Sequence, residues 1–352
     1  MADVLLTRQS VILAETEGTY GSNPTPTAAD NAILTTLPEF SFDVETYERN
    51  LARESLSPLD PRVTNINCSI SFSCELKGAG LGGVGSDQFG AATNIPEIDP
   101  LLKACGFART SQEGTDDWSG HYYKPSTAIG QSCTIYFYQG SDTSGNAHLK
   151  KITGCVGNVS FSVEQGGIGV ANFEMQGQYD GYASFGSDAL PTDANYQENL
   201  PPIAQTIGLS VAGDTGLDVS AIEINMNNEI QNIKSMVGDN LTATNFYLSG
   251  RAPSGSLNPL VEATSAGFVP IQSLEESTAF HTYFKLGSTD GNQVVFYLGG
   301  TENTGSVVTT RSAATLTNLG FEDDNGVARY NCEFMLGASF DTGNDEILIV
   351  YR

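Results

Sequence analysis

An internal repeat is the feature that most restricts the fold of this 352-residue chain. Three short segments recur in one order, the first two after 159 residues and the third after 157 residues. They are residues 99–104 and 258–263, residues 137–140 and 296–299, and residues 169–171 and 326–328. A common spacing for three matches predicts two related domains in tandem.

The composition is that of a turn-rich β-protein with a strong negative charge. The chain holds 38 glycines, only 16% of its residues are charged, and its formal net charge is −25. Such a field repels phosphate backbones, so binding through DNA charge is not expected, whereas DNA passing without adhesion is compatible with it. The first residues lack a basic segment followed by a long apolar run, and no apolar stretch is long enough to span a membrane.

Alternation of apolar and polar residues predicts that both domains are mainly β. Residues 66–76 alternate without a break, with Ile66 to Leu76 on one face and serines and asparagines on the other, and residues 158–163 alternate likewise. The only helix expected in the first domain covers residues 98–106, with Asp99 as N-cap and Pro100 in the first turn. The repeat then predicts a second helix that begins at Asn258 and Pro259.

The expected organisation is an arm, two domains and a linker. Residues 1–36 form the arm, in which Pro24 and Pro26 disfavour helix. Residues 37–182 form the first domain, residues 183–218 the proline-containing linker, and residues 219–352 the second domain. Each domain is expected to be a sheet with one packed face, one hydrated face and one flanking helix.

Motifs that could carry chemistry are weak, and no enzyme, cofactor or metal site is expected. Residues 78–83 match GxGxxG, but the following sequence does not open a helix, so a loop is favoured over a dinucleotide site. His121, His148 and His281 stand far apart and are expected on the surface or in loops. The Asp-rich segments 289–292 and 323–326 lack calcium-loop spacing and predict turns. The six cysteines lack paired CxxC spacing and predict buried, reduced thiols.

Several segments resemble the major tail tube protein family of long-tailed bacteriophages. The carrying segments are residues 13–21 with 24–26, 47–53, 71–78, 99–107, 152–161 and 343–347. They extend over nearly the whole chain, and each alone is moderately specific. Residues 79–95 and the linker look like insertions relative to shorter members of that family.

The resemblance implies β-sandwich domains that pair their sheets into a barrel-like ring, and rings that stack into a tube. Since six tube domains usually close one ring, a two-domain chain would form trimers, with hexamers as the second possibility. The hydrated strand faces would then line a DNA channel. The expected lining residues are Asn67, Ser69, Ser71, Ser73, Glu75, Asn158, Ser160, Ser162, Glu164, Asn172, Glu174, Gln176, Glu223, Asn225, Arg329, Asn331 and Glu333.

Contacts between stacked rings are expected from the two segments that precede the long strands. Their residues are Tyr47, Arg49, Leu51, Arg53, Leu56, Leu59, Ile230, Ile233 and Met236. The resemblance further implies a location in the virion tail, assembly in the host cytoplasm, tape-measure, tail terminator and distal tail proteins as partners, and duplex DNA in transit without specific binding. The alternative class is a two-module β-sandwich adhesin or capsid-decoration protein, and a nucleotide-dependent enzyme is a distant third.

Overall fold

The computed structural model describes most of the chain in a β-rich fold. The described residues are 6–55, 57–80, 95–112, 120–128, 131–142, 144–182, 188–204, 208–234, 244–261, 268–289, 291–303, 308–310, 312–338 and 343–352. The mainly β class predicted from the alternation is confirmed by two large antiparallel sheets and three short helices in these ranges.

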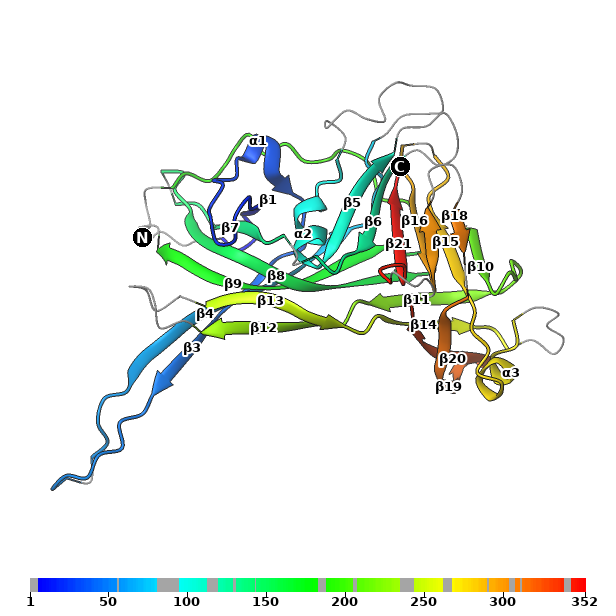
Figure 1. Cartoon of the computed structure of the whole chain (residues 1–352). Helices are drawn as coiled ribbons and strands as arrows, with labels where there is room; N and C mark the ends of the chain where they lie inside the picture. Colours follow the sequence, from blue (N-terminus) through cyan, green and yellow to red (C-terminus); the bar gives the residue numbers. More distant parts are fainter. Residues whose placement is uncertain are drawn as a thin grey trace.

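Within the described residues, the larger sheet has eleven strands, of which eight lie side by side and are called the eight-stranded sheet (Figure 1). In spatial order they are β3 (Glu39–Tyr47), β4 (Arg62–Glu75), β9 (Val170–Tyr182), β8 (His148–Glu164), β11 (Val219–Asn225), β14 (Ser254–Pro259), β20 (Val327–Leu336) and β19 (Ala314–Asp324). The first half of β8 also pairs with β7 (Cys133–Gln139), which carries β1 (Ser10–Thr16) and β2 (Ala32–Ile33) of the N-terminal arm.

The second sheet has six strands and covers the apolar face of the first. Its order is β10 (Gly208–Val211), β15 (Thr282–Leu286), β16 (Val294–Leu298), β21 (Ile347–Tyr351), β6 (Gly120–Pro125) and β5 (Phe107–Gln112). The remaining elements are the pairs β12 (Asn228–Lys234) with β13 (Thr244–Arg251) and β17 (Thr301–Asn303) with β18 (Val308–Thr310), and the helices α1 (Ala28–Asn31), α2 (Asp99–Ala104) and α3 (Pro270–Glu275).

The two halves of the chain interlock. The C-terminal strand β21 pairs with β6 of the first half, and β10 arises from the segment predicted as a linker. The phenyl ring of Phe161 on the large sheet lies 5.1 Å from that of Phe296 on the small sheet, within one continuous core. Apolar burial therefore holds the halves together through both sheets.

The strand pattern predicted for residues 66–76 is observed. Cys68, Ile70, Phe72, Cys74 and Leu76 are buried on one face of β4. All six cysteines are buried and free, as predicted. Burial raises the pKa of the Cys68 and Cys332 thiols to about 12, which makes them poor nucleophiles at neutral pH.

The repeat is visible in three dimensions as two equal sets of four strands. Ser41, Ser69 and Gln176 are cross-strand partners in the first half, and Glu223, Ser256 and Glu333 are partners in the second. The shift of 157 residues relates Gln176 to Glu333, so β3, β4, β9 and β8 correspond to β11, β14, β20 and β19. Both sets have the same order, and β8 pairs with β11, so the sets are joined head to tail.

The second predicted helix was placed wrongly. Asn258 and Pro259 end strand β14, and the helix of this half, α3, begins at Pro270 instead. The side chain of Asn258 accepts a hydrogen bond from Ala221 N at 2.7 Å, and Pro259 lies opposite Val219. The alternation of residues 254–258, with Leu257 buried, is the period of a strand, and it overrides the Asn-Pro helix signal.

Two smaller expectations were also wrong. The N-cap of α2 is Ile98 and not Asp99. The Asp99 carboxylate is instead buried, where it pairs with Lys103 at 2.8 Å and Arg109 at 3.0 Å. It also accepts a hydrogen bond from Tyr123. His121 is buried within β6, where its Nδ1 lies 2.8 Å from Ser111 Oγ. Tertiary contacts bury the Asp99 carboxylate, which the local pattern assigned to a helix cap, and the His121 ring, which it assigned to the surface or a loop.

Candidate functional site

The polar face of the eight-stranded sheet brings together residues from both halves of the chain. One cross-strand row runs through Ser73, Asn172, Ser160, Asn225 and Ser254 on five successive strands. Ser73 Oγ donates to Asn172 Oδ1 at 2.7 Å, and Asn158 Nδ2 donates to Asn225 Oδ1 at 2.9 Å across the junction of the halves. These side chains satisfy one another and stiffen the face.

Most of the residues predicted for this face are accessible. Glu164, Glu174, Gln176, Glu223 and Glu333 are exposed. The partly exposed residues are Ser69, Ser71, Ser73, Glu75, Asn158, Ser160, Ser162, Asn172, Asn225 and Asn331. Asn67 and Arg329 are buried, at 5% and 8% exposure, so they contribute little surface.

The face is strongly acidic. Besides the predicted glutamates, the pairing places carboxylates of the two outermost strands, β3 and β19, on this face. These additional residues are Glu39, Asp43, Glu45, Glu322 and Asp324. A surface of carboxylates, amides and hydroxyls offers no anchor for a phosphate.

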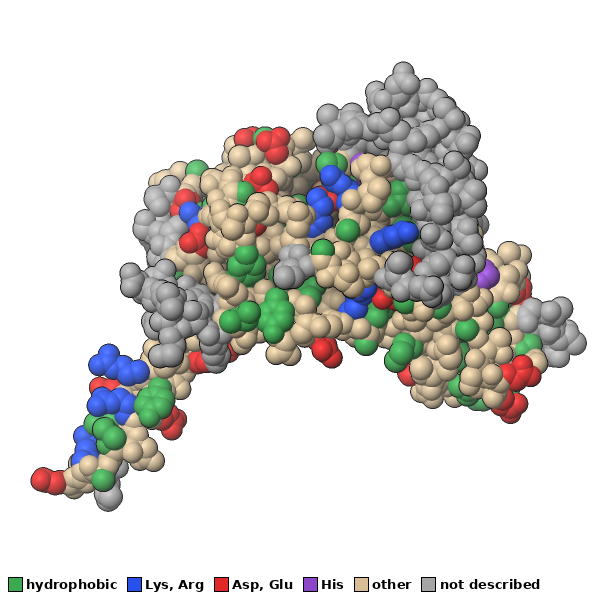
Figure 2. Space-filling model, viewed as in Figure 1, with side chains coloured by type: hydrophobic (Ala, Val, Ile, Leu, Met, Phe, Trp, Pro, Cys, Tyr) green, Lys and Arg blue, Asp and Glu red, His purple; other side chains and the backbone are tan. Residues whose placement is uncertain are grey.

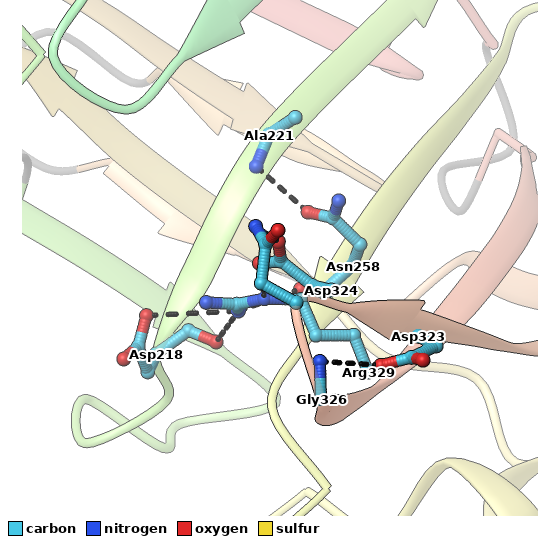
Figure 3. Close-up of polar contacts among 8 residues, drawn as sticks. Asp218, Ala221, Asn258, Asp323, Asp324, Gly326 and Arg329 are labelled. Carbon is cyan, nitrogen blue, oxygen red and sulfur yellow. Dashed lines mark hydrogen bonds and ion pairs between the residues drawn. The ribbon is translucent and has the colours of Figure 1, made fainter.

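Arg329, the basic residue predicted on this face, is neutralised by its neighbours (Figure 3). Its Nε lies 3.0 Å from Asp324 Oδ2, and its Nη1 lies 3.7 Å from Asp218 Oδ1. The guanidinium also donates to the backbone oxygens of Asp218 and Asn258, at 3.3 and 3.4 Å. Because the described partners of the guanidinium are all oxygens and its side chain is buried, Arg329 presents little free positive charge to the face.

Sequence reasoning missed the polar residues of β3 and β14. Ser41 and Ser69 share a hydrogen bond of 2.6 Å on β3 and β4, and Ser254 and Ser256 lie on β14. Residues 39–45 alternate strictly between polar and apolar types, which is a readable strand signal. For β14 the signal was hidden by the helix prediction at Asn258.

The segments predicted for contacts between rings differ in their surroundings. The tip of the long hairpin β3–β4 projects away from the body of the molecule (Figure 1), and Tyr47 and Leu51 on it are 65% and 62% exposed. Arg49, Arg53 and Leu59 lie on the same projection, which Figure 2 shows with blue and green side chains. On β12, Ile233 is exposed and Ile230 partly buried. Leu56 and Met236 lie outside the described residues.

The remaining motifs do not form a chemical site in the described ranges. Gly78 N donates to Asn292 Oδ1 at 2.9 Å, whereas residues 81–83 of the glycine motif and Asp290 lie outside the described residues. No three His, Cys, Asp or Glu side chains are grouped as metal ligands within the part of the chain that is described. None of the helices in that part is long and apolar enough to cross a membrane.

Comparison with known families agrees with this architecture. The described fold is a β-rich subunit with one extended acidic sheet face. The family profile described as phage tail tube protein matches residues 7–307. The chain therefore belongs to the phage tail tube protein family and is a structural component of the virion tail. A search of curated proteins gives no match.

Proposed function

We propose that this protein assembles into stacked rings whose bore is lined by the polar face of the eight-stranded sheet, and that phage DNA passes through this bore. The observation that supports the proposal most is the cross-strand continuity of that face across both halves, from Ser73 to Ser254. A hydrated acidic wall lets a polyanion slide because it offers no retaining cation.

The proposed ring contains three chains. Each chain carries two four-stranded sets in the same order, and β8 already pairs with β11 as neighbouring sets would in a ring. Six sets, the number that family resemblance implies, then require three copies. The projecting tip of β3–β4, with Tyr47, Arg49, Leu51, Arg53 and Leu59, is proposed to reach the adjacent ring.

The proposed partners are further copies of this chain, the tape-measure protein, and the terminator and distal tail proteins at the tube ends. Assembly is proposed to take place in the host cytoplasm, without catalysis or cofactor. DNA is in transit and makes no specific contact with the wall.

Electron microscopy and native mass spectrometry of the purified protein test these proposals separately. We expect stacked rings with six repeated units and a ring mass of three chains. Six chains per ring would refute the trimer and leave the tube intact. A protein that remains monomeric in every condition and binds a glycan would instead favour the adhesin.

A further inference from the structure

Apolar side chains on β3 are exposed, whereas the side chains at the equivalent positions of the second half are buried. The cross-strand row from Phe42 through Cys68 to Gly177 corresponds to the row from Ile224 through Gly255 to Phe334. Phe42 therefore occupies the position of Ile224, and Val44, two residues on, occupies that of Met226. Ile224 and Met226 are 1% and 0% exposed, whereas Phe42 and Val44 are 49% and 45% exposed. The difference arises because β11 pairs with β8, whereas among the described strands β3 pairs only with β4.

The opposite end of the sheet shows the complementary difference. Val159 on β8 lies opposite Phe173, and Phe321 on β19 lies opposite Tyr330, so Phe321 occupies the position of Val159. Val159 is fully buried against the second half, whereas Phe321 is 65% exposed. Within the described strands β19 pairs only with β20, and its outer edge is otherwise bridged at Ala314, which pairs with Phe280. The edge around Phe321 is therefore open in the described part of the chain. Such an edge favours pairing with another strand.

We infer that the β3 edge of one copy binds the β19 edge of the next copy in the register of the internal junction. This inference rests on the proposed ring and specifies its interface. Met226 N donates to Val159 O at 3.1 Å within the chain. The equivalent bond between copies joins Val44 N to Phe321 O, and it places the two exposed side chains directly opposite each other.

The helix beside β19 supplies a second part of the same interface. At the end of α2, Cys105 O accepts a hydrogen bond from Asn228 of the β12–β13 hairpin at 2.8 Å. Glu276 ends α3 as Cys105 ends α2, and counting along β3 from Phe42 places Thr46 at the position of Asn228, just beyond a register shift between Glu45 and Thr46. In the proposed interface this end of the β3–β4 pair, where Arg62 lies opposite Tyr47, faces the Glu276 end of α3 in the next copy.

A pair of engineered cysteines tests the register. In Val44→Cys/Phe321→Cys we expect mild oxidation of the assembled protein to convert the monomer band into linked species of up to three chains. Opposite residues of an antiparallel pair lie within disulfide distance. The native thiols are buried and do not compete.

The matched control is Asp43→Cys/Phe321→Cys, which moves one thiol by a single residue onto the other face of the sheet. We expect it to remain monomeric on the denaturing gel. Rings by microscopy without links in Val44→Cys/Phe321→Cys, or equal links in both variants, would overturn the interface and leave the tube function standing. Links without rings would support the interface and refute the proposed ring. If neither links nor rings form, both the interface and the proposed ring are overturned.

A second variant tests the polar side of the same register. The proposed register places Glu322 of one copy opposite Asp43 of the next, and this like-charge pair opposes pairing of the two edges. Glu322→Gln should therefore raise the fraction of assembled protein at low salt, whereas Glu333→Gln, away from the edge, should not. Equal behaviour of the two variants would contradict this register.

Discussion

At the scale of single residues, the buried Glu17 and the partly buried Tyr20 of the N-terminal arm bind it to the body. The carboxylate of Glu17 accepts hydrogen bonds from Ser132 Oγ, Thr134 Oγ1, Gly154 N and Gly21 N, at 2.5 to 2.7 Å. Tyr20, three residues on, donates to Gly154 O and accepts from Phe246 N of β13. The arm therefore holds both the first half and the hairpin of the second half.

Glu17→Gln should destabilise the fold by about 2 kcal/mol, because each carboxylate oxygen accepts one backbone N–H that cannot reverse its role. Whichever way the new amide is oriented, its NH2 group faces one of those donors. Urea denaturation followed by circular dichroism measures the change. Glu15→Gln, two residues away on β1, is the control and should shift stability by less than about 0.5 kcal/mol.

Tyr20→Phe should cost about 1 kcal/mol at neutral pH through the lost hydrogen bonds. Burial raises the pKa of Tyr20 to about 12, partly opposed by the hydrogen bond from Phe246 N. A raised folded-state pKa means that the hydroxyl contribution is complete below the unfolded-state pKa near 10 and is lost as pH rises toward about 12. The stability difference between wild type and Tyr20→Phe should therefore shrink between those values. A difference that grows with pH would contradict this assignment.

At the scale of elements, strict alternation identified the long strands and their faces because burial on one side fixes a period of two. It located the apolar face of β4 and most members of the polar face. Helix signals were weaker: Asn-Pro at residues 258–259 resembles a helix start, yet β11 and β20 on either side recruit it into a sheet. The contacts of Arg329 with Asp218 and Asn258 join residues distant in sequence, which no local pattern reports.

The β19–β20 turn is the clearest case in which conformation requires a residue type. Asn325 and Gly326 have φ of 54° and 91°, the left-handed pair of a two-residue hairpin turn. A Cβ on Gly326 would meet nothing within 4 Å, so Gly326→Ala tests backbone strain alone. We expect a loss of about 1 kcal/mol in denaturant unfolding. Gly18→Ala, equally open and without a positive φ, should be close to neutral.

At the scale of the whole molecule, the arrangement of charge separates the roles of the surfaces. The net charge of −25 is concentrated in part on the sheet face proposed to line the bore, and its arginine is held between Asp218 and Asp324. The exposed apolar side chains Phe42, Val44 and Phe321 lie instead on the two outer strands of the sheet. One face is thus suited to a passing polyanion, and the two edges are suited to another copy.

If that face lines the proposed bore, reversing its charge should make assembled tubes retain DNA. In tubes of Glu174→Lys/Glu223→Lys, we expect short duplex DNA to bind with an affinity that falls as salt increases, because each new cation contacts a phosphate. DNA held in the bore should resist nuclease. Asp193→Lys/Glu198→Lys makes the same charge change on exposed residues of the 183–218 segment, so DNA bound there should remain nuclease-sensitive. Equal protection in both tubes would show that the sheet face does not line the bore.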